Sequence, residues 1–204
     1  MSLPAEIFAV ASLDSKELSS EELAAKCREG CRDSFALLVE KFEARVFSYL
    51  CRFVGNEHDA EDLTQDTFVS AFRNIHRYEP RYAFSTWIFT IAKRAALSHF
   101  RSRQTARRIL EEEFVPEKEI DADDPAVLLE QKDGQSQIWN AAKGLKPKHH
   151  EALWLRYGEG FSVAETAQIM GASQIYVKVL IHRGRGELAK ILARREKLSA
   201  DART

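Results

Sequence analysis

The sequence contains few of the features on which secreted and membrane proteins depend. It has three cysteines in 204 residues, an odd number that cannot be fully paired. No stretch approaches the ~18 apolar residues of a membrane-spanning helix, and residues 1–18 lack the charged start and apolar core of a signal peptide. We therefore expect a cytoplasmic protein with free thiols and no membrane insertion. Cys27 and Cys31 lie one helical turn apart, which favours small buried thiols and leaves open a redox sensor or a metal site.

Motifs that carry catalysis are also missing. The sequence has no glycine-rich loop for phosphates, no nucleophile elbow and no histidine-rich metal spacing. A metal nuclease would have to use the carboxylates between Asp59 and Asp66, which fall on one helix and mostly face away from any pocket that this helix lines. We therefore expect a protein without enzymatic activity, cofactor or metal.

Glycine and proline are scarce as well, at nine and five residues. Apolar residues recur at the helical period over long stretches, which predicts an all-α protein. The length suits two small helical bundles, and the highly charged, unpatterned stretch Glu111–Asp123 predicts a linker between them. Caps and helix breakers predict helices from Ser19 or Ser20 to Gly30, Asp33 to Phe53, Glu57 to Ile75, Thr86 to about Arg108, Asp124 to Gly144 and Lys146 to Gly158. Ser85 is expected to cap the helix that begins at Thr86. A pair of helices is expected within Ser162–Leu188, followed by a charged tail that frays after about Leu192.

The formal net charge of −1 conceals a segregation of charge along the chain. Basic residues dominate Lys93–Arg108 and Leu145–Lys197, whereas acidic residues dominate Glu111–Asp133 between them. Basic segments suit phosphate groups, and an acidic segment is repelled by them. The order basic, acidic, basic is therefore consistent with two phosphate-binding regions separated by an acidic tether.

The segment Ser162–Leu188 is organised like a helix-turn-helix unit. Ser162 and Glu165 form a capping box, Gly171 suits a tight turn, and Ser173 can cap the second helix. In units of this build the second helix enters the DNA major groove. The positions expected to face the bases are unusually apolar for that role, while the opposite side fits a buried face. The outward positions are Ile175, Tyr176, Val179 and Leu180, and the inward ones are Val177, Ile181, Gly184 and Leu188.

Aromatic and basic side chains occur together in Ile75–Arg108. Unpaired bases need aromatic faces to stack on, and the strand needs positive charge, so the combination is typical of a single-stranded DNA site. The alternative is that Trp87 belongs to the core and that the arginines form a solvated face. The aromatic members are Tyr78, Tyr82, Phe84 and Trp87, and the basic members are Arg77, Arg81, Lys93, Arg94 and Arg101.

Four segments carry a resemblance to a known family. They are DAEDLTQDTFVSAF (59–72), FSTWIFTIAKRAALSHFRSR (84–103), LKPKHHEALWLRYGEGFSVAETAQIMGAS (145–173) and VKVLIHRGRGEL (177–188). In this order and spacing they resemble the extracytoplasmic function (ECF) sigma factors of bacterial RNA polymerase over about residues 33–192. The resemblance implies sigma region 2 at 19–108, an acidic linker at 109–123 and sigma region 4 at 124–197, flanked by tails at 1–18 and 198–204.

The resemblance also implies partners and contact residues: core RNA polymerase through its clamp helices and flap, promoter DNA, and in some cases an anti-sigma factor. The acidic linker matches the segment that threads towards the active-site and RNA-exit channels of the polymerase. The implied polymerase contacts are Asp59, Asp62, Leu63, Gln65, Asp66 and Val69. The implied contacts for melting and reading the −10 element are Tyr78, Arg81, Tyr82, Trp87, Lys93, Arg94 and Arg101. The implied contacts to the −35 duplex are Ser173, Gln174, Tyr176, Lys178, Val179, His182, Arg183 and Arg185.

The chain departs from the family pattern at both DNA-reading helices. Arg94 and Ser98 stand where relatives usually carry Asn and Asp, and Val179 and Leu180 stand where a hydroxyl and a guanidinium usually meet DNA. Three accounts of the second departure remain open: contacts to thymine methyls, reliance on phosphate contacts, or cover by a protein partner such as an anti-sigma factor.

The resemblance implies a sigma factor that directs promoter-specific transcription initiation. The alternative hypothesis is a free-standing helix-turn-helix regulator with an N-terminal sensing bundle. It accounts for Ser162–Leu188 but not for the aromatic and basic segment or the acidic tether.

Overall fold

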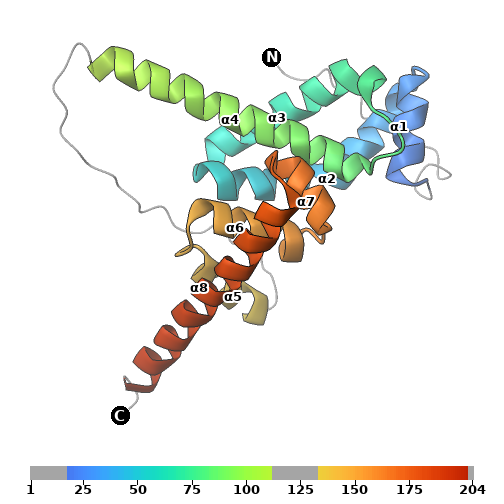
Figure 1. Cartoon of the computed structure of the whole chain (residues 1–204). Coiled ribbons are helices and arrows are strands. Elements are labelled where there is room, and N and C mark those ends of the chain that lie inside the picture. The colour runs from blue at the N-terminus through green and yellow to red at the C-terminus, as the bar shows by residue number, and fades with distance from the viewer. Residues whose placement is uncertain (1–17, 112–132, 202–204) are drawn as a thin grey trace. The chain divides into compact units, whose positions relative to one another are not determined.

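The computed structural model describes residues 18–111 and 133–201, and every regular element in these ranges is a helix (Figure 1). The chain divides into two compact units, residues 1–125 and 126–204. The predicted all-α fold of two helical bundles is therefore confirmed. Of the expected linker at 109–123, residues from 112 on lie outside the described ranges, as do residues 1–17 of the expected N-terminal tail.

The first unit contains α1 (Ser20–Arg28), α2 (Arg32–Val54), α3 (Glu57–Asn74), the 3-10 turn η3 (Ile75–Arg77) and α4 (Phe84–Glu111). Helix α4 packs on both α2 and α3, and α1 packs on α2 and on the first part of α4 (Figure 1). Apolar positions at the helical period face inward, as expected for amphipathic helices around one core. The fully buried apolar side chains include Leu38, Val46, Leu50, Phe84, Ile88 and Phe89.

Local sequence explains most helix ends of the first unit; the exceptions are the starts of α2 and α4. Ser19, one of the two serines expected to cap this helix, forms a capping box with Glu22 at the start of α1, and Gly55 ends α2 in the left-handed region at φ 73°. Helix α2 begins at Arg32 and has Cys31 at its N-cap. The prediction that Ser85 caps α4 is wrong, because α4 begins at Phe84 and Ser85 lies inside its first turn.

The second unit contains α5 (Asp133–Ala142), α6 (Pro147–Leu153), a π-helical turn η4 (Trp154–Gly158), α7 (Val163–Met170) and α8 (Gln174–Asp201). Helices α5, α6 and α7 each pack on α8. The predicted start of the first of these helices at Asp124 lies outside the described residues. The core of the unit comprises Ala142, Leu145, Ala152, Leu153, Ala167, Val177, Leu180 and Ile181.

Helix α8 is longer than the sequence predicted. It continues past Leu192 to Asp201, so residues 198–201 of the expected tail are helical. Two contacts with α5 and the loop after it hold this part of α8. Ile191, just before Leu192, packs beside Gly144, and in the added turns Arg195 Nη2 donates to the carbonyl of Asn140 at 3.3 Å. The charged composition of this segment predicted fraying, and composition alone does not reveal these tertiary contacts.

The three cysteines are free, but only one is buried. Burial raises the pKa of Cys27 to about 12 and that of Cys51 to about 11. Cys31 is exposed, and hydrogen bonds from Ser34 lower its pKa, so the expectation of a buried thiol is wrong for Cys31. In the described ranges no three His, Cys, Asp or Glu side chains gather as a metal site. The helices of these ranges include none with the length and apolar character to cross a membrane.

Candidate nucleic-acid and polymerase-binding surfaces

The outward face of α3 carries the acidic positions suggested by the sequence. Asn56 caps the helix by accepting a hydrogen bond from the N–H of Asp59 at 3.1 Å. Asp62, Gln65 and Asp66 are exposed on the side opposite the buried Leu63. This face is therefore an accessible polar surface with negative charge.

Three other predicted polymerase contacts are placed differently. Asp59 is only a quarter exposed, and its Oδ2 lies 2.8 Å from Arg103 Nη1 and 3.4 Å from His99 Nε2, both on α4. Leu63 is 5% exposed and belongs to the core, and Val69 is half-buried. Asp59 therefore joins α3 to α4, and Leu63 supports the exposed face without being part of it.

A buried aromatic cluster lies beneath the start of α4. Tyr78 is 1% exposed and Phe84 is fully buried, with their rings 5.5 Å apart at an angle of 78°. The Tyr78 hydroxyl donates to the carbonyl of Tyr82 at 2.6 Å. Burial, with a smaller contribution from the Glu21 carboxylate, raises the pKa of Tyr78 to about 12. The structure thus corrects the expectation that the Tyr78 ring is offered to bases: it is a buried support for the loop above it.

Tyr82 and Arg81 form the exposed part of the same segment. Tyr82 is 44% exposed, and the Arg81 guanidinium lies 4.9 Å above its ring and pairs with Glu79. Trp87 is half-buried, with its ring 5.3 Å from that of Tyr78. An aromatic face beside a cation is therefore present, and Tyr82 supplies it.

The basic side chains of α4 fall into two groups. Lys93 is 9% exposed, and its Nζ lies 3.7 Å from the centre of the Phe53 ring, which places the charge in a cation–π contact. Arg94 and Arg101 are exposed. The structure therefore leaves Arg94 and Arg101 as surface cations, while Lys93 is held against the core.

The helix-turn-helix has the predicted local structure. Ser162 and Glu165 form the capping box of α7, and Gly171 ends the helix in the left-handed region at φ 62°. The Ser173 hydroxyl accepts a hydrogen bond from the N–H of Tyr176 at 3.2 Å and so caps α8. The predicted unit at Ser162–Leu188 is confirmed in its helices, its turn and its caps.

One outward position on α8 was assigned wrongly. Leu180 is 4% exposed and lies in the core with Val177 and Ile181. Gly184 faces the same way, since a Cβ there would lie 3.1 Å from Leu153. Ile175 is 77% exposed, and the adjacent apolar side chains Tyr176 and Val179 are 43% and 37% exposed. The apolar strip on α8 thus consists of Ile175, Tyr176 and Val179.

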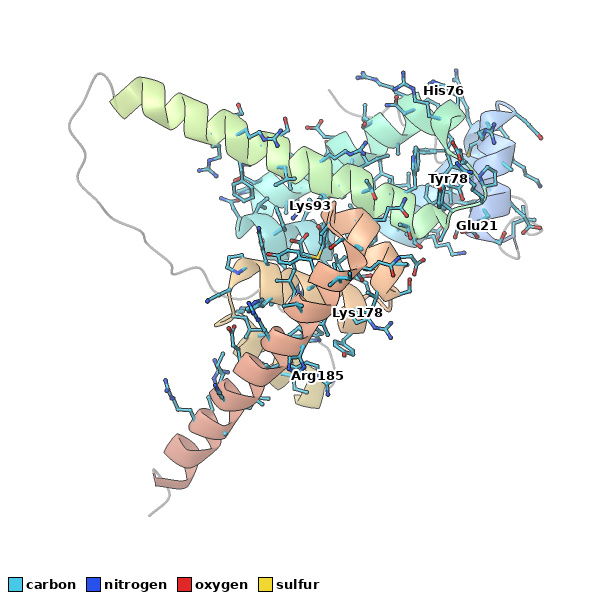
Figure 2. The ribbon with its side chains drawn as sticks, in the orientation of Figure 1. Glu21, His76, Tyr78, Lys93, Lys178 and Arg185 are labelled. Carbon is cyan, nitrogen blue, oxygen red and sulfur yellow. The ribbon has the colours of Figure 1, made fainter. Side chains whose placement is uncertain are left out.

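All predicted −35 contacts are exposed, which their role requires. Lys178 and Arg185 lie on α8 (Figure 2), and the Lys148 ammonium lies 6.0 Å from the Tyr176 ring. The exposed set comprises Ser173, Gln174, Tyr176, Lys178, Val179, His182, Arg183 and Arg185.

Sequence reasoning missed two long-range contacts. The Glu21 carboxylate accepts a hydrogen bond from the N–H of Phe84 at 3.0 Å, and His149 Nδ1 lies 2.8 Å from Glu187 Oε2. The His149 hydrogen bond lowers the pKa of Glu187, with the charges of Lys146 and Lys190 adding to it. No periodic or capping signal in the sequence connects residues this far apart.

Two family models match the chain in the order of its two units. The model of sigma-70 region 2 matches residues 38–106, and that of sigma-70 region 4 matches residues 135–188. The ECF RNA polymerase sigma factor BldN of Streptomyces coelicolor is 32% identical over 181 residues, which cover 88% of this chain and 68% of BldN. The chain belongs to the ECF sigma factor family.

Further comparisons agree with this sigma factor assignment over most of the chain. The RNA polymerase sigma factor CarQ of Myxococcus xanthus is 33% identical over 172 residues, covering 83% of this sigma factor and 95% of CarQ. The sigma factor RpoE of Bartonella quintana, solved in complex with the anti-sigma factor NepR, has a similar structure with a TM-score of 0.62 at 25% identity. That match covers 78% of this chain and 96% of RpoE.

Proposed function

We propose that the protein is an alternative sigma factor that binds core RNA polymerase and directs promoter-specific initiation. Region 2 would melt and read the −10 element, and region 4 would read the −35 element as duplex. The observation that carries this proposal is the match to region 2 and region 4 in one chain. Asp62, Gln65 and Asp66 are exposed in the first unit, and all the predicted −35 contacts are exposed in the second. A free-standing regulator would use the second unit alone and would leave the surfaces of the first unexplained.

The exposed acidic face of α3 supports the proposed contact with polymerase. Asp62, Gln65 and Asp66 form a continuous polar surface at helical spacing, and their side chains have no role in the core of the unit. We assign the clamp helices of core polymerase to this face. Asp59 and Leu63 act indirectly in this assignment, because they hold α3 on α4 and on the core.

The start of α4 supports the proposed contact with single-stranded DNA. Tyr82 offers a ring face with the Arg81 guanidinium above it, and stacking of one base on an aromatic side chain is worth about 1–3 kcal/mol. Arg94 and Arg101 supply positive charge further along α4. Tyr78 and Lys93 contribute to this site as supports beneath its surface.

The first turns of α8 support contacts to duplex DNA of a mixed kind. Lys178, Arg183 and Arg185 suit phosphates, which position a helix without reading sequence. The apolar strip Ile175, Tyr176 and Val179 suits thymine methyl groups, which apolar side chains contact well. The burial of Leu180 removes one apolar side chain from the reading face. Region 4 therefore reads DNA through fewer polar base contacts than the family pattern implies.

Regulation by an anti-sigma factor is a second part of the proposal. The RpoE structure was determined with the anti-sigma factor NepR, and an exposed apolar strip on α8 suits a protein partner as well as DNA. We assign no catalytic activity to the chain, since its surfaces are those of a binding subunit, and we place its action in the cytoplasm with polymerase.

Transcription with purified components tests the main proposal. The chain is mixed with core RNA polymerase and a library of promoter fragments, and the transcripts that start at defined positions are sequenced. We expect a family of templates that shares a −10 and a −35 element. Absence of both a complex with core polymerase and any specific transcript would refute the proposal.

A pair of charge reversals tests the assignment of the α3 face. We expect Asp62→Arg with Asp66→Arg to abolish binding to core polymerase while the thermal unfolding of the chain stays unchanged. The matched control is Glu40→Arg with Glu43→Arg, which makes the same charge change at exposed positions of α2. Equal loss of binding in both variants would mean that net charge, and not this face, governs the interaction.

A further inference from the structure

The first turn of α4 is capped by a residue from another helix. Helix α4 begins at Phe84, and the preceding Ala83 has no side-chain acceptor to offer. The N–H of Phe84 instead donates to Oε1 of Glu21 at 3.0 Å, across 63 positions of sequence. A carboxylate at a helix N-terminus satisfies an otherwise unpaired N–H and is favoured by the helix dipole. Glu21 therefore has the chemical role of an N-cap for α4.

Glu21 is itself held in place by the local structure of α1. Ser19 and Glu22 fix the first turn of α1, with the Ser19 N–H donating to Glu22 at 2.7 Å and the Glu22 N–H donating to Ser19 at 3.2 Å. The buried side chains of Leu23 and Ala24 attach this turn to the core. The carboxylate that caps α4 thus projects from a rigid support.

The loop before α4 is held at two neighbouring backbone groups. The Tyr78 hydroxyl donates to the carbonyl of Tyr82, and Glu21 accepts from the N–H of Phe84, so the two contacts lie on either side of Ala83. Figure 2 shows Glu21 and Tyr78 close together at one end of the first unit. The N–H of Tyr82 also donates to the carbonyl of Glu79 at 3.1 Å, which closes the turn. These bonds fix the backbone that carries the Tyr82 ring.

We infer that Glu21 is a positioning residue for −10 recognition, which holds the loop of residues 79–83 so that the Tyr82 ring is preorganised to stack on an unpaired base. The inference rests on the proposed function of the first unit. Glu21 touches no base in this account and acts through the backbone of Phe84. Without the cap, the loop would have to be ordered when DNA binds, and that entropic cost would weaken binding.

Binding of a single-stranded oligonucleotide by the holoenzyme tests the inference. The probe is a fluorescent non-template strand that carries the −10 element selected by the transcription library. We expect Glu21→Ala to weaken binding by roughly tenfold, the size of a lost hydrogen bond to a charged group. Glu21→Gln retains an acceptor oxygen of the same reach and should bind within about twofold of the original chain. The control Glu29→Ala removes the same charge from the other, exposed end of α1 and should have no effect.

A double-mutant cycle separates positioning of Tyr82 from general stabilisation of the fold. In the Tyr82→Ala background, Glu21→Ala should cause no further loss, because the ring that Glu21 positions is gone. The inference would be overturned if Glu21→Ala caused the same tenfold loss in that background. It would also be overturned if Glu21→Gln bound the oligonucleotide as weakly as Glu21→Ala. If Glu21→Ala does not fold, Glu21→Asp provides the comparison, since it keeps the charge and is one methylene too short.

The activity of the original chain distinguishes a failure of this inference from a failure of the proposed function. If its holoenzyme initiates at selected promoters and Glu21→Ala behaves identically, the inference alone is wrong. If the holoenzyme initiates at no promoter, the proposed function fails and the inference falls with it.

Discussion

Helices α4 and α8 are both 28 residues long and both carry a proposed DNA-binding surface, but their first turns are built in opposite ways. The first turn of α4 is buried around Phe84 and capped by Glu21 from a different helix. The first turn of α8 exposes Ile175 and Tyr176 and is capped by the adjacent Ser173. The start of α4 therefore depends on the whole first unit, whereas the start of α8 is determined by a few neighbouring residues.

This difference suits the two tasks proposed for the helices. A site for an unpaired base must hold one aromatic ring in place against a flexible strand, and tertiary contacts give that rigidity. A helix that enters a duplex groove needs an exposed face, and a local cap leaves that face uncovered. Two proposed sites on one chain bound to one polymerase raise the effective concentration of each other, so the proposed role of α8 requires only modest affinity.

The largest expected difference between the two first turns is in stability. Phe84→Ala should lower the free energy of unfolding of the first unit by about 3–5 kcal/mol, because it opens a cavity in the aromatic cluster. Ile175→Ala should change the second unit by less than about 0.5 kcal/mol, because the side chain is 77% exposed. Hydrogen exchange of peptides from each unit, measured over a denaturant series, reports both values. A large loss for Ile175→Ala would show that its side chain is covered in the free protein.

A smaller difference is expected at the two serines that the sequence offered as caps. Ser173→Ala should destabilise the second unit by about 1 kcal/mol, because it removes the acceptor for the Tyr176 N–H. Ser85→Ala should be neutral or slightly stabilising, because Ser85 lies within α4, where alanine is the better helix former by about 0.5 kcal/mol. Thermal unfolding of both variants gives the comparison. A cost at Ser85 equal to that at Ser173 would restore Ser85 as the cap.

These two serines also illustrate which parts of the fold were predictable. Where a helix end is set by residues within about four positions, as at Ser19, Ser162, Gly171 and Ser173, the sequence predicted it correctly. Where a distant partner decides, the prediction failed, as at Ser85 and at the extension of α8 held by Arg195. Capping chemistry is visible in sequence only when both partners are local.

The candidate site residues were likewise predictable where one helix determines their exposure and unpredictable where packing between elements does. Periodicity placed Asp62, Gln65 and Asp66 on an exposed face, because one helix determines that face. It did not reveal that Tyr78 and Lys93 are buried, because packing of Tyr78 on Phe84 and of Lys93 on Phe53 joins different elements. At Leu180 the family pattern suggested a DNA contact, but the side chain is buried in the core with residues of α6 and α7.

The smallest effect is expected near the middle of α8, where Glu187 joins the helix to His149 on α6. The hydrogen bond from His149 lowers the pKa of Glu187 in the folded protein, so the carboxylate stabilises the second unit above the ordinary glutamate pKa of 4.5. This contribution is lost as the pH falls below that value through the folded pKa. The second unit of Glu187→Gln should therefore unfold at a lower temperature than that of the original chain near neutral pH. In acid the two unfolding temperatures should converge.

The effect should be modest because the Glu187 side chain is 37% exposed and solvent screens the interaction. The control is Glu43→Gln, which removes an exposed charge from α2 in the first unit. It should leave the unfolding temperature of the second unit unchanged at neutral and at acid pH. A difference at Glu187→Gln that persists unchanged in acid would mean that packing of the side chain, and not its charge, ties α8 to α6. In that case α8 would resemble α4 more closely, since both helices would then be held mainly by buried contacts and only their first turns would differ.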